Sequence, residues 1–167
     1  MISRRRFTQL SALSLGSLSA GALLSPDKLR AEILAPPTSD ITLELAPYLL
    51  EASPKHHIRT LAYNNQVPGP LLRMRQGRPT SVTIRNNTPD PEIVHWHGLF
   101  LPSEIDGAME EGTPMIAPGA STHYTLTPDP PGFRWYHTHV RAGNDLSKGL
   151  YSGLFGPLVI EPASHPG

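Results

Sequence analysis

Four of the eight histidines in this chain lie in two short motifs. The motifs are His95-Trp96-His97-Gly98 and Trp135-Tyr136-His137-Thr138-His139. Successive side chains of a β-strand point to opposite faces, so a His-x-His pair on a strand aims both imidazoles the same way. Two such strands side by side would present four imidazole nitrogens to one place. The two motifs together predict a metal centre.

The identity of the metal is narrowed by the residue types that are present. The chain contains no cysteine, which excludes disulfides, thiol catalysis, iron–sulfur clusters and thiolate zinc sites. Any metal must therefore be held by His, Asp or Glu. Neutral imidazoles suit copper, zinc, iron or nickel, and the general order of affinities favours copper. The spacing of the histidines does not choose among these metals.

The remaining histidines are interpreted as residues that do not bind metal. His56 and His57 are expected at an exposed strand start, His123 within a strand and His165 in the C-terminal tail. The tryptophans of the two motifs are interpreted as packing residues, because an aromatic side chain opposite a ligand face normally fills a core. The Glu110-Glu111 pair is expected to lie in a solvated loop.

The charge distribution argues against nucleic acid and anionic membranes as partners. The formal charge of the whole chain is zero, but five basic residues lie among the first 30. Beyond residue 30, nine basic residues face thirteen acidic ones, which gives a net charge of about −4. No run of lysine or arginine follows residue 30, so neither a phosphate backbone nor an anionic lipid surface is indicated.

Residues 1–31 are predicted to be a signal peptide. A basic start is followed by an apolar stretch of about 15 residues from Leu10 to Leu24, whereas spanning a bilayer takes about 20 apolar residues. No stable membrane span is therefore expected. The segment Ser3-Arg4-Arg5-Arg6-Phe7 resembles a twin-arginine export signal, which implies export of the folded protein to the periplasm or beyond. The cleavage site is not evident from the sequence.

The rest of the chain is predicted to form one all-β domain. Short apolar runs are separated by turn signals, and their spacing fits an antiparallel sandwich or barrel. We expect an N-terminal linker and first strand over 32–54, the main domain over 55–162 and a tail over 163–167. Only a short helical turn is expected, within 144–151. The predicted strands are 41–45, 57–63, 81–85, 93–97, 121–126, 133–139 and 154–161.

From about Val67 to Glu161 the chain resembles the first cupredoxin domain of the multicopper oxidases, the laccase-like family. The resemblance implies a cupredoxin-like Greek-key β-sandwich or barrel. Besides the two histidine motifs, it rests on Val67-Pro68-Gly69-Pro70, Asn86-Asn87, Asp106-Gly107, Pro118-Gly119 and the stretch from Gly149 to Leu158.

The resemblance also implies roles for individual residues. In this family the first domain donates four histidines to a trinuclear copper cluster that reduces dioxygen to water. By this correspondence His95 would bind the type 2 copper, whereas His97, His137 and His139 would serve the type 3 pair. Asp106 matches an acid that assists proton delivery in the family, and its alternative role is an Asp-Gly turn. The reducing substrate is not identified by these residues.

The other ligands of the cluster, and the cysteine motif of the type 1 copper, belong to a later domain in this family and are missing from this sequence. A second cupredoxin domain is therefore the expected partner. The chain is interpreted as the N-terminal part of a longer oxidase, with a separate subunit that pairs with another polypeptide as the alternative. We expect the isolated chain to be inactive as an oxidase. Two other functions remain open, namely a non-enzymatic exported scaffold and a mononuclear copper or zinc carrier.

Overall fold

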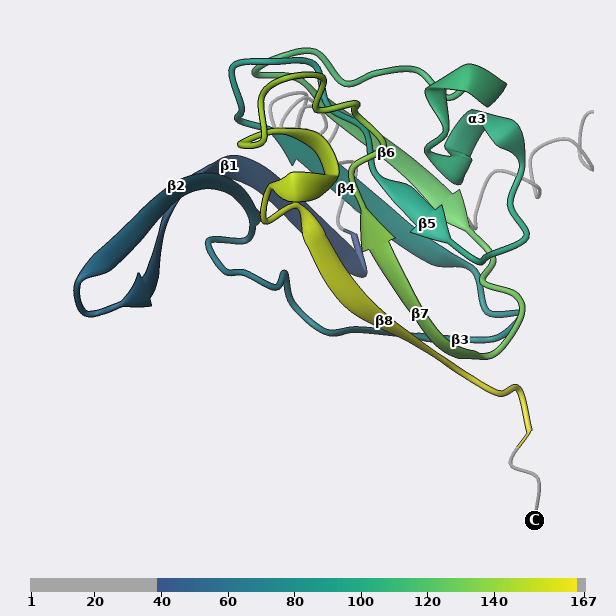
Figure 1. Ribbon diagram of the computed structural model, residues 1–167. Helices are drawn as coiled ribbons and strands as arrows, with labels where there is room; N and C mark the ends of the chain where they lie inside the picture. The colour runs from purple at the N-terminus through teal and green to yellow at the C-terminus, as the bar shows by residue number, and fades with distance from the viewer. Residues whose placement is uncertain (1–38, 165–167) are drawn as a thin grey trace, which may run out of the picture. The chain divides into compact units, whose positions relative to one another are not determined.

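Alternating buried and exposed side chains form two β-sheets that pack face to face in the computed structural model, which describes residues 39–164. One sheet has the order β2-β1-β4-β6 and the other the order β3-β8-β7-β5 (Figure 1). The predicted β-sandwich is therefore confirmed. The predicted signal peptide and His165 lie outside the described residues.

The strand bounds agree with most of the predicted runs. The eight strands are β1 (Ile41–Ser53), β2 (His56–Tyr63), β3 (Leu72–Arg75), β4 (Thr80–Asn86), β5 (His95–His97), β6 (Ser121–Leu126), β7 (Gly132–His137) and β8 (Phe155–Glu161). Helical structure among the described residues is limited to α3 (Ser103–Asp106), η1 (Met109–Glu111) and η2 (Gly149–Tyr151). The last of these is the short turn expected within 144–151. None of these helices has the length and apolar content that a membrane span requires.

The expectation of purely antiparallel sheets is wrong. β1 pairs with β4 in parallel, and β3 pairs with β8 in parallel, while the other pairs are antiparallel. Both parallel pairs join strands that are distant in sequence, so the chain has room to cross over between them. β3 was not predicted, although Leu72 and Met74 are buried and alternate with exposed arginines.

The hydrophobic core between the sheets contains the residues that alternate with the histidines of the two motifs. Trp96 and Tyr136 are fully buried and face each other across the β5–β7 ladder. The Tyr136 hydroxyl donates a hydrogen bond to the Pro70 carbonyl at 2.7 Å. A Cβ on Gly69 would come within 2.6 Å of that hydroxyl oxygen, which explains why this turn needs a glycine. Burial of the Trp96 face therefore orients the opposite, histidine-bearing face outward.

Asn86 fastens the loop that connects β4 to β5. Its buried amide donates hydrogen bonds to the carbonyls of Asp90 and Ile116, both at 2.8 Å. Its side-chain oxygen accepts bonds from the backbone N–H and the hydroxyl of Thr88. One side chain thus satisfies four polar groups, and it fixes the start of the segment that leads to His95.

We predict that Asn86→Ala lowers the free energy of unfolding by about 3 kcal/mol, because it leaves several buried polar groups without partners. Asn87→Ala is the matched control, since the exposed Asn87 amide makes a single side-chain bond to Glu44 and its loss is expected to be near neutral. Urea unfolding of both variants measures the difference. Equal effects of the two substitutions would contradict this assignment.

Candidate metal centre

β5 and β7 are adjacent antiparallel strands, and their register brings the two histidine motifs together. His95 lies directly opposite His137, and His97 lies opposite Trp135. The candidate ligand atoms of His95, His97 and His137 all lie within 4.8 Å of one another. The convergence of two His-x-His strands that the sequence predicted is thus present for three of the four histidines.

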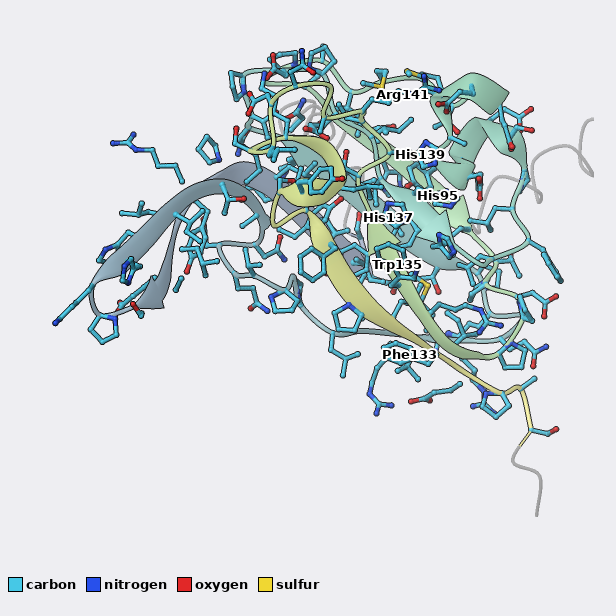
Figure 2. The ribbon with its side chains drawn as sticks, in the orientation of Figure 1. His95, Phe133, Trp135, His137, His139 and Arg141 are labelled. Atoms are coloured by element: carbon cyan, nitrogen blue, oxygen red, sulfur yellow. The ribbon has the colours of Figure 1, made fainter. Side chains whose placement is uncertain are left out.

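His139 lies at the border of this cluster. It follows the last residue of β7, so no strand ladder holds it. Its ring centroid is 5.1 Å from that of His95 and 6.0 Å from that of His137. Figure 2 shows His95, His137 and His139 gathered at the C-terminal end of β7. The ring of the fourth predicted histidine therefore lies in the same group, although its ligand atoms are not among those within 4.8 Å of one another.

The hydrogen bonds of His95 and His137 determine which nitrogen of each ring is free. His95 Nδ1 lies 2.9 Å from the Asp106 carbonyl oxygen, and His137 Nδ1 lies 2.7 Å from the Thr138 carbonyl oxygen. A carbonyl oxygen only accepts, so both Nδ1 atoms carry the proton and both Nε2 atoms present a lone pair. Backbone carbonyls that fix the ring in this way are typical of the outer shell of metal sites.

The free nitrogen of His137 faces the ring of His97. His137 Nε2 lies 3.3 Å from His97 Nδ1, so a metal ion that both atoms bind would replace the proton between them. Burial lowers the pKa of His137 to about 4, and burial followed by the neighbouring His95 lowers the pKa of His97. Both rings are therefore neutral near pH 7, which is the form that binds metal.

Asp106 lies beside the cluster at the end of helix α3. Its carboxylate oxygen Oδ2 is 3.3 Å from His95 Nδ1, and its side chain is mostly buried. Gly107 follows with a φ of 91°, and a Cβ there would overlap the Val94 carbonyl and the His95 Cα. The Asp-Gly turn and the contact with His95 are thus both present, so the turn is not the only feature of this residue.

Three residues near the cluster were not predicted to belong to it. Trp135 was interpreted as core packing, but it is 37% exposed and its ring stacks on His137 with centroids 4.0 Å apart. The period of two places Trp135 on the same face as His137, so the alternation contained this signal. Trp96, in contrast, is buried as predicted.

Glu110 was expected to lie in a solvated loop; it is exposed, as expected, but lies in the short helix η1. Its Oε2 lies 3.3 Å from His139 Nδ1, and its Oε1 lies 3.3 Å from Arg141 Nη2. The contact with His139 does not have hydrogen-bond geometry, and within residues 39–164 the buried His139 Nδ1 has no hydrogen-bond partner. No local pattern in the sequence indicated this proximity.

Glu92 is the third unpredicted residue. It is 2% exposed and accepts a hydrogen bond at 2.7 Å from the Thr138 hydroxyl. Burial raises the pKa of Glu92 to about 7, against a smaller opposing effect of that hydrogen bond. Thr138, which separates His137 from His139, therefore contacts a buried carboxyl group that titrates near neutral pH.

The donor set fits a copper ion. It consists of imidazoles with free nitrogens, held by backbone carbonyls, with no thiolate among them. The buried Nδ1 of His139, which has no hydrogen-bond partner in the part of the chain that the structure describes, is a further donor beside them. Imidazole nitrogens suit copper well, although zinc accepts the same ligands.

The fold and these histidines define a cupredoxin-type β-sandwich with a candidate metal centre at one edge. The family model described as multicopper oxidase matches residues 49–165. The chain therefore belongs to the multicopper oxidase family.

Curated relatives and solved structures agree with this assignment. The multicopper oxidase MmcO of Mycobacterium tuberculosis is 37% identical over 110 residues, which cover 66% of this chain and 20% of the relative. Copper resistance protein A of Pseudomonas syringae pv. tomato is 35% identical over 101 residues, which cover 60% of this chain and 16% of the relative. The chain thus spans a fifth or less of the length of these curated relatives.

Among solved structures, a multi-copper oxidase from Pseudomonas thermotolerans superimposes with a TM-score of 0.64 and 33% identity, over 78% of this chain and 32% of that chain. Lac15 from a marine microbial metagenome superimposes with a TM-score of 0.65 and 30% identity, over 75% of this chain and 33% of that chain.

We predict that the wild-type protein loses stability relative to Glu92→Gln as the pH rises from about 4.5 to 7. In this window the folded protein keeps the Glu92 proton while the unfolded chain releases it. The contribution of Glu92 to the free energy of unfolding is therefore complete below the pKa of the unfolded chain and is lost as the pH rises through the pKa of the folded protein. The expected change in the difference is about 3 kcal/mol. Urea unfolding of both proteins at pH 4 and pH 8 measures it, and parallel pH profiles would contradict the burial of an ionisable group at this position.

Proposed function

We propose that this chain is the copper-binding first cupredoxin domain of a multicopper oxidase. The single observation that carries the proposal is the close group of ligand atoms from His95, His97 and His137, aligned by the β5–β7 register. Membership of the multicopper oxidase family supports copper as the metal. The proposed ligands are these three residues and His139.

Within the complete oxidase we propose that these histidines form half of a trinuclear copper cluster. By the family correspondence, His95 would hold the type 2 copper and His97, His137 and His139 the type 3 pair. Copper in such a cluster would couple the one-electron oxidation of a reducing substrate to the four-electron reduction of dioxygen to water. The backbone carbonyls of Asp106 and Thr138 keep the Nε2 atoms of His95 and His137 available for this role.

We propose that Asp106 assists proton delivery next to the cluster. Its carboxylate lies beside the protonated nitrogen of His95 and is mostly shielded from solvent. A carboxylate in this position is suited to general acid–base catalysis, because it lies within reach of the site and is not one of the proposed metal ligands. Proton delivery during dioxygen reduction is the role that follows.

We propose that a second cupredoxin domain covers the histidine face and provides the remaining ligands. His97 is exposed, and the aromatic residues Phe100, Phe133 and Trp135 lie around it with 76%, 71% and 37% of their surfaces exposed. Figure 2 shows Phe133 and Trp135 in line with His137 and His139. Exposed apolar patches of this kind mark interaction surfaces.

We further propose that the protein is exported, and that it uses the twin-arginine route. The basis is the segment Ser3-Arg4-Arg5-Arg6-Phe7 in the sequence. A folded, copper-loaded domain is the kind of cargo that this route carries. The proposal concerns the leader alone and is independent of the metal centre.

We predict that the full chain binds Cu(II) and that the double substitution His95→Ala, His137→Ala weakens binding by well over tenfold. Loss of an outer-shell partner alone costs about 10–100-fold in metal affinity, and these two residues are proposed ligands. The matched control is His56→Ala, His57→Ala, which removes two exposed imidazoles from β2. Copper titration with a competing chelator measures the affinity of each protein.

Unchanged copper uptake in the His95/His137 variant would contradict the proposal, because the copper would then be bound elsewhere. The stoichiometry in the same titration addresses the carrier alternative, which is supported by three ligand atoms that already lie close enough to share one ion. Tight binding of a single ion per chain favours a carrier, and weak binding favours a site that a second domain completes.

A further inference from the structure

The buried carboxylate of Glu92 has no role in the proposed chemistry, yet it lies directly behind the histidine strand. Its backbone is fixed by two hydrogen bonds with Ile116, from Glu92 N–H to the Ile116 carbonyl at 3.0 Å and from Ile116 N–H to the Glu92 carbonyl at 2.8 Å. The side chain therefore extends from an anchored position. Its carboxylate accepts a hydrogen bond from the Thr138 hydroxyl.

Thr138 lies between two of the proposed ligands and is completely buried. Its hydroxyl donates to Glu92 Oε2 at 2.7 Å and accepts a hydrogen bond from the Val140 backbone N–H at 3.1 Å. Its own backbone N–H donates to the Leu154 carbonyl at 3.0 Å. One side chain thus connects the anchored carboxylate to the backbone on the far side of His139.

The hydrogen bonds among Glu92, Thr138 and Val140 hold the chain where the strand pairing of β7 ends, at His137. β7 pairs with β5 and β8 only as far as that residue, so the direction of the next two residues depends on other contacts. The Thr138 carbonyl that fixes His137 Nδ1 is part of the same segment. Any shift of Thr138 would move the carbonyl that orients His137 and the backbone that carries His139.

We propose that Glu92 is a positioning residue of the metal centre, which fixes the Thr138 hydroxyl and thereby sets the orientation of His137 and His139. A buried carboxylate lowers stability unless its interactions compensate for lost hydration. An apolar side chain would fill the same space with a smaller loss of hydration free energy. A positioning role explains why an acid occupies this place. The inference rests on the proposed function, because His137 and His139 are ligands only in that proposal.

The test compares variants that remove the connection with variants that keep it. Glu92→Leu removes the acceptor and Thr138→Val removes the hydroxyl, whereas Glu92→Gln and Thr138→Ser retain each group. Thr83→Val is the matched control, since Thr83 is also a buried threonine with a side-chain hydrogen bond, to His123, and lies in the other sheet. The full chain is used throughout.

We predict that Glu92→Leu and Thr138→Val each weaken Cu(II) binding by about 10-fold or more and alter the electron paramagnetic resonance spectrum of the bound ion. Glu92→Gln, Thr138→Ser and Thr83→Val are expected to keep the affinity and spectrum of the original chain. Urea unfolding at pH 8 is expected to show Glu92→Leu at least as stable as the original chain, because it replaces a buried acid. Original affinity and spectrum in Glu92→Leu would overturn the inference.

A second readout does not depend on copper. The imidazole nitrogen resonances of His137 and His139 in the metal-free protein are expected to shift in Glu92→Leu and Thr138→Val, but not in Thr83→Val. Unshifted resonances would overturn the positioning role even if copper binding fell. If the original chain itself failed to bind copper, the proposed function would fail, while these resonances would still decide whether Glu92 positions the two rings.

Discussion

The metal centre depends on the backbone register between β5 and β7. Because His95 lies opposite His137 in this ladder, the period of two gathers the ligand atoms of three histidines on one face and buries Trp96 and Tyr136 on the other. A slip of one residue in either strand would exchange these faces. The aromatic core therefore fixes the register, and the register fixes the distances among the imidazoles. Chemistry and stability are linked through the same few backbone hydrogen bonds.

The surroundings of the histidines complete the site. Two backbone carbonyls, from Asp106 and Thr138, select the nitrogens that remain free on His95 and His137. The Asp106 carbonyl comes from the end of helix α3, and the Thr138 carbonyl comes from the residue directly after β7. Two separate parts of the chain thus orient adjacent rings. A preformed arrangement of imidazoles lowers the ordering that metal binding requires. The open aromatic rim around His97 leaves this face available to another domain.

The sequence predicted much of this arrangement because strand alternation is a local property. The strand runs, the convergence of His95, His97 and His137, and the burial of Trp96 all follow from a period of two. The parallel β1–β4 and β3–β8 pairs do not, since pairing between distant strands is decided by the packing of the whole sandwich. Glu92 and Glu110 were missed for the same reason. Each approaches the second histidine motif from a loop that lies far from it in sequence, and only the folded chain brings them together.

X-ray absorption spectroscopy at the copper edge of the copper-loaded chain tests the central claim most directly. If β5 and β7 together provide the ligands, the spectrum will show a first shell of nitrogen atoms and the multiple-scattering features of imidazole. A first shell of oxygen atoms, without imidazole features, would contradict the assignment of this face as the metal centre.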